Sequence, residues 1–331
     1  MPTKITPSES NLVSTALVQG ATRHAVAQHT FVPNEIDQQR VETVLQCKIA
    51  KFSCRYLGLQ LAIHQLSRAD WQPLLDQVRH FIPAWQRDFI QRSGRLVLVK
   101  TVIVARPVHQ LLVLDPPAWV LEDINKWMRS FFWAGKDKSH GEQCLVAWDT
   151  VCRLTSFGGL GVKNLAVQAL ALRVRWEWLR RTDPKRPWQG LHLMVDEQAR
   201  AVFDSLVKIT IGEGSKILFW KDRWIHGVAI KDIAPLLLQL VSTRDKNRRT
   251  VQEALLDNAW ANDIHGELSF MGHMQVYLLT QAISLVERNI DEPDQFDWPY
   301  DASGKYTTSS TYTRLCIGYT RAPAAGGIWR S

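Results

Sequence analysis

The spacing of apolar residues along the chain predicts a mainly helical protein. Over residues 68–91, apolar positions recur every three or four residues, which is the period of one helix face. The apolar stretch that follows Ser93 and Gly94 predicts a second helix, ending before Pro107 because proline does not continue a helix. The same criteria predict further helices at residues 34–45, 118–133, 164–181 and 249–260.

A few segments have strand or turn patterns instead. Residues 52–63 alternate in polarity around Gly58 and predict a β-hairpin, with the glycine allowing close backbone approach. Residues 212–216 are typical of a hairpin turn, and residues 294–312 of strand, turn and strand before a helix near Ser309. The basic run at residues 244–249 is interpreted as a linker. The fold class predicted from these patterns is mainly α with small β-hairpins (α+β).

Tryptophan is unusually frequent. The chain has 14 tryptophans, and seven of them lie in residues 119–188. Indole is a large apolar group with one N–H donor, so such tryptophans commonly anchor helices to one another. Trp220 and Trp224 are expected to be buried as well. The glycine-rich run from Phe157 to Gly161 lacks the lysine and spacing of a phosphate loop, and predicts a tight turn into the next helix.

The positive charge is concentrated in one region. The formal net charge is +8, and residues 85–188 alone contain seventeen Lys/Arg and nine Asp/Glu. Cations interleaved with aromatic rings suit nucleic acid, because cations neutralise phosphates while rings stack on unpaired bases. A tryptophan core beneath an ordinary solvated helix face would produce the same pattern, so both interpretations stay open.

The sequence offers little catalytic or metal chemistry. Polymerisation on two metal ions commonly uses adjacent aspartates, and the chain has no Asp-Asp pair. The five cysteines include no C-x-x-C pair, so no zinc site, metal or other cofactor is expected, and a reducing intracellular compartment is favoured. No signal peptide or membrane-spanning segment is recognised. Asp149, Asp222 and Asp263 are interpreted as helix caps or surface charges.

Ten sequence blocks in a fixed order resemble a known family. SFFWAG, CLVAWDTVC and FGGLGVKNL, preceded by FSCRYLGLQLAI and followed by LFWKDRWIHGVAIKDIAPLL, resemble the region downstream of the polymerase core in plant non-LTR (LINE-type) retrotransposon reverse transcriptases. The resemblance covers roughly residues 40–331. It implies a C-terminal fragment, from the thumb to the start of the zinc-binding domain, that lacks the catalytic palm. We therefore expect the chain not to be an enzyme.

The resemblance also implies an architecture: a thumb-like helical bundle followed by a tryptophan-rich helical connector. We divide the chain into a poorly ordered tail (1–34), a hairpin with thumb-like helices (35–115), a basic connector (116–245), and a helix with the start of a truncated zinc-binding domain (246–331). In the family, the zinc ligands lie further on, and Cys316 alone cannot hold zinc. A nuclear location is implied by the resemblance only.

The expected function is non-catalytic binding of RNA or an RNA–DNA hybrid, with no membrane or small-molecule partner and an open oligomeric state. Alternatives are a degenerate retroelement relic without selected activity, or a domesticated scaffold protein. By the resemblance, the hairpin lies beside a primer 3′ end, whereas a packed strand is the plainer interpretation. A second basic face is expected on the helix at 164–181, which includes Arg180 and Arg181. The candidate contact residues are Tyr56, Gly58, Arg92, Arg95, Lys100, Lys163, Arg173 and Arg175.

Overall fold

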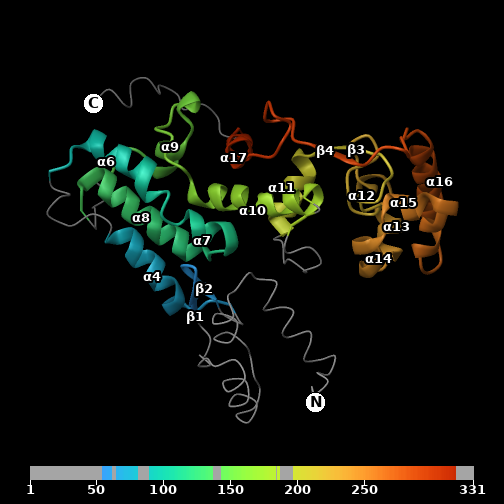
Figure 1. Ribbon diagram of the computed structural model, residues 1–331, viewed down its shortest axis with the longest axis horizontal. Helices are drawn as coiled ribbons and strands as arrows, with labels where there is room; N and C mark the ends of the chain where they lie inside the picture. Colours follow the sequence, from blue (N-terminus) through green and yellow to red (C-terminus); the bar gives the residue numbers. More distant parts are fainter. Residues whose placement is uncertain are drawn as a thin grey trace, which may run out of the picture. The chain divides into compact units, whose positions relative to one another are not determined.

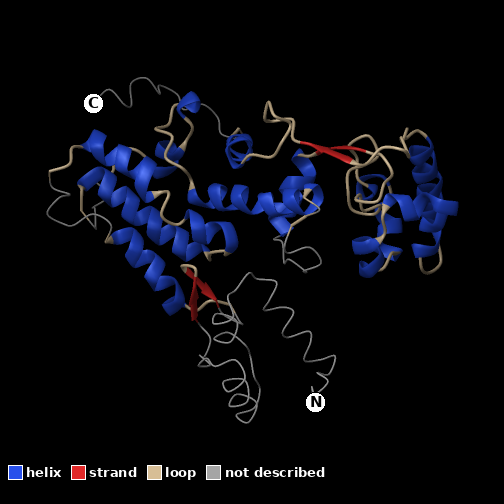
Figure 2. Ribbon diagram, viewed as in Figure 1, coloured by secondary structure: helices blue, strands red, loops and turns tan. Residues whose placement is uncertain are grey.

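The computed structural model describes residues 54–61, 65–80, 89–136, 143–183, 185–186 and 197–317. In these ranges the chain is mainly helical with two small antiparallel sheets, as predicted (Figures 1 and 2). The tail at 1–34 and the helix expected at 34–45 lie outside the described residues. The chain forms two compact units: residues 1–169, 185–193 and 316–331 make the first unit, and residues 170–184 and 194–315 the second. The division of the chain into four segments, made above from the family resemblance, stays a prediction, because the two compact units do not test it.

The first unit begins with the predicted hairpin. Strand β1 (Cys54–Tyr56) pairs antiparallel with β2 (Leu59–Leu61), with Tyr56 opposite Leu59. Both turn residues have positive φ, 49° at Leu57 and 83° at Gly58. A two-residue turn of this kind matches the right-handed twist of the strands, and glycine is the residue that adopts it without strain.

Two helices follow that the apolar pattern predicted in part. Helix α4 (Arg68–Arg79) starts at a capping box between Ser67 and Asp70, and buries Trp71, Leu74, Leu75 and Val78. The second predicted helix is not continuous. It begins as α6 (Arg92–Leu98), changes to a π-helical turn, η1 (Val99–Ile103), and ends before the turn that leads to α7 (Val108–Val113). Val99 and Ile103, at the two ends of this turn, are both fully buried.

Helix α8 (Ala118–Ala134) is the centre of the first unit and lies where the sequence predicted it. It buries Val120, Ile124, Trp127, Met128 and Phe131, and ends at Gly135, whose φ of 71° gives a left-handed cap. The next described helix is α9 (Trp148–Cys152). It leads through η3 (Thr155–Phe157) into α10 (Leu165–Thr182).

The glycine run before α10 is a tight turn, as predicted. Gly158 and Gly161 have φ of 81° and 70°. A Cβ on Gly159 would lie 2.2 Å from the carbonyl oxygen of Arg153, so the chain folds back on itself only with glycine there. The N–H groups of Gly159 and Gly161 donate to the carbonyls of Leu154 and Arg153, which holds the turn against the end of α9.

The second unit packs short helices around an aromatic core. Phe219, Trp220, Trp224, Trp260 and Trp298 are all buried, which confirms the expectation for Trp220 and Trp224. The rings of Phe219 and Trp220 meet edge to face with centroids 4.9 Å apart. The elements after α10 are α11 (Glu197–Leu206), β3 (Lys208–Thr210), α12 (Ile230–Ile233), α13 (Pro235–Leu240), α14 (Thr243–Arg248), α15 (Val251–Leu255), η4 (Leu256–Asp263), α16 (Phe270–Ser284), β4 (Gln295–Asp297) and α17 (Thr308–Cys316).

The hairpin predicted at residues 212–216 is wrong. Strand β3 pairs instead with the distant strand β4, with Lys208 opposite Asp297. The buried carboxylate of Asp294 explains the difference, because it accepts backbone N–H groups of Gly212, Gly214 and Lys216, each at 2.9 Å. The loop at residues 212–216 therefore surrounds the carboxylate of Asp294, which lies about eighty residues further along the chain. These bonds align β3 with β4.

Two more sequence interpretations in the second unit need correction. The basic run at 244–249 is not a linker, because most of it forms α14, whose first turn is capped by Ser242. In residues 294–312 only the first predicted strand forms, as β4, and the chain then turns into α17. Among the described helices, none is long and apolar enough to cross a membrane.

Candidate nucleic-acid interface

The tip of the first hairpin rests on α7. Nε2 of His109 donates a hydrogen bond to the carbonyl oxygen of Leu57 at 3.0 Å. Gly58 is exposed, and a Cβ added to it would come within 4.0 Å of the His109 ring. Tyr56 is the last residue of β1 and directly precedes this turn. Of the two hairpin candidates, Tyr56 precedes the turn and Gly58 belongs to it, and the turn is anchored to a helix.

Arg92 lies at the start of α6 with its guanidinium over an indole ring. The carbon Cζ is 5.4 Å from the ring centroid of Trp133, a cation–π distance, and Arg92 is exposed while the indole is buried. The ring supports the arginine from one side. The other side is open to an anion.

Arg95, one turn further along α6, is engaged with backbone. Its Nε donates to the carbonyl of Ile90 at 3.0 Å and its Nη1 to the carbonyl of Phe131 at 3.4 Å. The Phe131 carbonyl also accepts the N–H of Gly135 at the end of α8. Burial, and secondarily the charge of Arg92, lowers the pKa of Arg95. Arg95 therefore links the start of α6 to the end of α8.

Lys100 is exposed on the π turn and faces the glycine turn. Its Nζ would lie 3.6 Å from a Cβ on Gly161, which is ordinary van der Waals contact, so the ammonium group lies directly beside the glycine turn. Within the described part of the chain, Lys100 takes part in no ion pair or hydrogen bond. Two residues beyond Gly161, half-buried Lys163 has its pKa lowered by burial, a shift that Cys316 opposes. We call Arg92, Arg95, Lys100 and Lys163 the basic cluster.

The remaining two candidates lie in the second unit. Arg175 is exposed on α10, and Arg173 is half-buried on the same helix. Four of the eight candidates, the basic cluster, lie in the first unit, between the start of α6 and the segment that precedes α10. Tyr56 and Gly58 lie at the hairpin, and Arg173 and Arg175 on a different compact unit.

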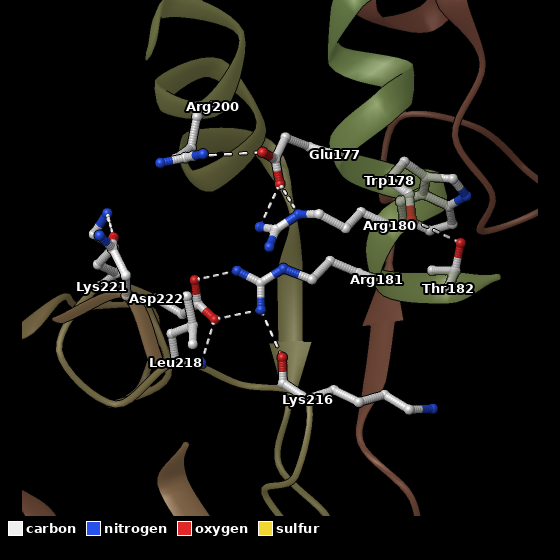
Figure 3. A network of polar contacts seen from close by, with 11 residues as sticks. Glu177, Trp178, Arg180, Arg181, Thr182, Arg200, Lys216, Leu218, Lys221 and Asp222 are labelled. Atoms are coloured by element: carbon white, nitrogen blue, oxygen red, sulfur yellow. Dashed lines mark hydrogen bonds and ion pairs between the residues drawn. The ribbon is translucent and has the colours of Figure 1, made fainter. Parts of the chain in front are cut away.

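The second basic face expected on α10 is wrong for Arg180 and Arg181 (Figure 3). Arg181 is buried and donates to both carboxylate oxygens of Asp222, at 2.7 and 2.6 Å. Arg180 donates to the fully buried carboxylate of Glu177 at 2.7 Å, and Arg200 approaches the other oxygen of Glu177 at 3.4 Å. Internal carboxylates neutralise these cations, so they do not form an open positive surface.

Two aspartates assigned to caps or the surface are structural ion-pair partners instead. Asp222 accepts the N–H of Leu218 at 2.6 Å in addition to Arg181. Asp263 accepts the Trp220 indole N–H at 2.9 Å and pairs with Arg249. Burial alone would raise the pKa of Asp263, but the hydrogen bonds from Arg249 and Trp220 outweigh it and hold that pKa below the usual value.

Asp204, a titratable residue near the Arg181–Asp222 pair, could not be recognised from the sequence. Burial, reinforced by the charge of Asp222, raises the pKa of Asp204 to about 7. A lone aspartate near the end of an amphipathic helix looks like a solvated charge. Except for Arg200 on the same helix, the charged groups that act on it, Asp222, Arg181 and Glu177, come from segments that are distant along the chain. In the described ranges, no three His, Cys, Asp or Glu side chains are grouped so as to hold a metal ion.

The chain is similar to a curated plant protein. No model of a known protein family matches it. A protein of Arabidopsis thaliana named "Putative ribonuclease H protein" is 23% identical over 290 residues, which is 78% of this chain and 44% of the relative. The chain therefore spans less than half the length of the relative that it matches.

Proposed function

We propose that this chain is a non-catalytic segment that binds RNA or an RNA–DNA hybrid through the first unit. In this proposal it corresponds to the thumb and connector of a plant non-LTR retrotransposon reverse transcriptase. The basic cluster carries the proposal, because it puts exposed positive charge beside a tight glycine turn. The similarity to a plant protein named for ribonuclease H supports a link to nucleic acid.

The geometry suits contact with a phosphate backbone. Lys100 presents an ammonium group with no partner among the described residues, and Arg92 presents a guanidinium held in place by the Trp133 ring. Backbone contacts fix the position of a duplex without reading its sequence. The hairpin turn at Gly58 would then approach the end of the duplex, as the family resemblance implies. No polymerisation chemistry is included in the proposal, since the chain has no adjacent aspartate pair.

The structure sharpens the choice of residue for a test. Arg95 donates to the carbonyls of Ile90 and Phe131, so reversing its charge would disturb the fold together with any contact. Lys100 makes no such bond in the part of the chain that the structure describes. Lys100→Glu therefore changes surface charge with little effect on packing, and Lys231→Glu, at an exposed lysine of the second unit, is the matched control.

The test is fluorescence anisotropy of the full chain with a labelled RNA–DNA hybrid, titrated from low to high salt. We expect saturable binding, tighter for the hybrid than for duplex DNA, with a steep negative salt dependence. Lys100→Glu should weaken binding and reduce the salt slope by about one unit, whereas Lys231→Glu should not. Equal losses in both variants would mean that binding follows net charge and would contradict the proposal. Weak binding of equal affinity for the hybrid and for duplex DNA would favour a retroelement relic without selected activity.

A further inference from the structure

Helix α16 of the second unit has an exposed apolar face with no charged residue. From residue 268 to residue 286 the chain contains no Asp, Glu, Lys or Arg. At 100° per residue, the exposed apolar side chains fall within about 120° of the helix circumference. Their exposed fractions run from 43% at Met274 to 79% at Phe270. The α16 face consists of Phe270, Met271, Met274, Tyr277, Leu278 and Leu285, with Gln281 between them.

The α16 face belongs to a fixed element and not to a loose end. The opposite side of the helix buries Gly272 and Leu279, and α16 packs against α12 and α13 (Figure 1). Oε1 of Gln275 accepts the N–H groups of Leu236 and Leu237, at 2.9 and 3.3 Å, at the start of α13. At the far end, Nε2 of His226 donates to the carbonyl of Leu285 at 3.2 Å. A rigid apolar face of this kind marks an interaction surface.

We propose that the α16 face binds the α16 face of a second copy of this chain, with the two helices antiparallel. The exposed parts of its six apolar side chains amount to roughly 600 Å² per copy, near the 800 Å² or so that each partner buries in a standard interface. Methionines at 271 and 274 can adapt to an opposing surface. This inference does not depend on the proposed nucleic-acid function.

One pair of charges at the ends of the helix fits the antiparallel arrangement. Exposed Glu267 precedes the α16 face, exposed Glu287 and Arg288 follow it, and no ion pair joins Glu267 or Arg288 to another described residue. A two-fold axis through the middle of the α16 face places Glu267 of each copy beside Arg288 of the other. The face itself is free of charge, so the positive net charge of the chain causes no repulsion at the contact. An amphipathic helix on a membrane surface is typically rich in Lys and Arg, which α16 lacks.

The test is sedimentation velocity of the full chain across a range of micromolar concentrations. We expect a monomer–dimer equilibrium that Tyr277→Glu weakens at least tenfold. Val97→Glu, at an exposed apolar residue of the first unit, should leave it unchanged. Circular dichroism and the thermal midpoint establish that each variant is folded. A chain that stays monomeric throughout, or a dimer that Tyr277→Glu does not weaken, would overturn the proposal.

A charge swap provides the second measurement. Glu267→Arg alone and Arg288→Glu alone should each weaken the dimer, because each places like charges together across the axis. The double variant should restore it, because the pair is then reversed but complementary. Two independent losses without recovery would contradict the antiparallel arrangement.

Discussion

Arg181 and Asp222 form a two-point ion pair that is almost entirely removed from solvent. Both guanidinium Nη atoms donate to the carboxylate, at 2.7 and 2.6 Å, and the two side chains are 6% and 3% exposed. The carbonyl of Lys216 accepts a further bond from Arg181 at 2.6 Å. The pair connects the last turn of α10 to the loop before Trp224, and so holds the aromatic core of the second unit against that helix.

Removing one partner of this pair should destabilise the chain strongly. Asp222→Ala leaves the buried Arg181 cation uncompensated, and we expect a loss of about 3–5 kcal/mol in the free energy of unfolding measured with urea. The double variant Arg181→Met/Asp222→Leu should lose less than Asp222→Ala alone, because neither member of the pair is left as a buried charge without its partner. Glu122→Gln, which breaks an exposed pair with Lys126, is the control and should cost under about 0.5 kcal/mol.

Periodicity predicted the regular parts of this fold for a physical reason. Helix α8 has an apolar residue at nearly every inward position, a proline pair before its start and a glycine after its end, so local signals alone define it. The hairpin at Gly58 is equally local, because its turn needs positive φ within two residues. The mainly helical class and the buried Trp220 and Trp224 followed from the same patterns.

The features that the sequence did not predict depend on partners distant in the chain. Asp222 resembled a surface charge because nothing near it in the sequence shows that Arg181, 41 residues away, is buried beside it. The pairing of β3 with β4 depends on Asp294, about eighty residues from the loop that it holds. For the candidate site, local charge located the basic cluster, but only the fold separates exposed Lys100 from Arg95, which donates to backbone carbonyls.

Asp204 should make the stability of the second unit depend on pH. Its pKa is raised to about 7, first by burial and then by Asp222 and Glu177, while Arg181 and Arg200 oppose the shift. The folded chain therefore holds the Asp204 proton more tightly than the unfolded chain does. This contribution to stability is fully present below the unfolded pKa of about 4, and is lost as pH rises through 7.

Asp204→Asn keeps the shape of the protonated acid without a charge. Near pH 4 the variant and the parent chain should be about equally stable. By pH 8 the variant should be more stable by roughly 2 kcal/mol, a figure reduced from the full shift to allow for solvent screening. Urea unfolding across this pH range is the measurement, and Asp257→Asn at an exposed site is the control. A difference that does not change with pH would rule out titration of Asp204 in this range.

Arg95 should contribute to stability more than to binding. Arg95→Gln removes the bonds to the carbonyls of Ile90 and Phe131, and we expect a loss of about 1–2 kcal/mol in the free energy of unfolding. Lys100→Glu should change stability by less than about 0.5 kcal/mol, since Lys100 has no hydrogen bond within the described residues. Equal stability of the two variants would show that the carbonyl contacts of Arg95 contribute little.

Removing the Asp294 carboxylate should destabilise the loop that surrounds it. Asp294→Ala leaves the N–H groups of Gly212, Gly214 and Lys216 without their acceptor, and we expect a loss of about 3 kcal/mol in the free energy of unfolding. Asp294→Asn should cost less, because one oxygen can still accept the two glycine N–H groups while the amide nitrogen cannot accept from Lys216. Asp291→Ala, at an exposed aspartate in the same segment, should have almost no effect. Equal stabilities of Asp294→Ala and Asp291→Ala would mean that the pairing of β3 and β4 holds the loop without the carboxylate.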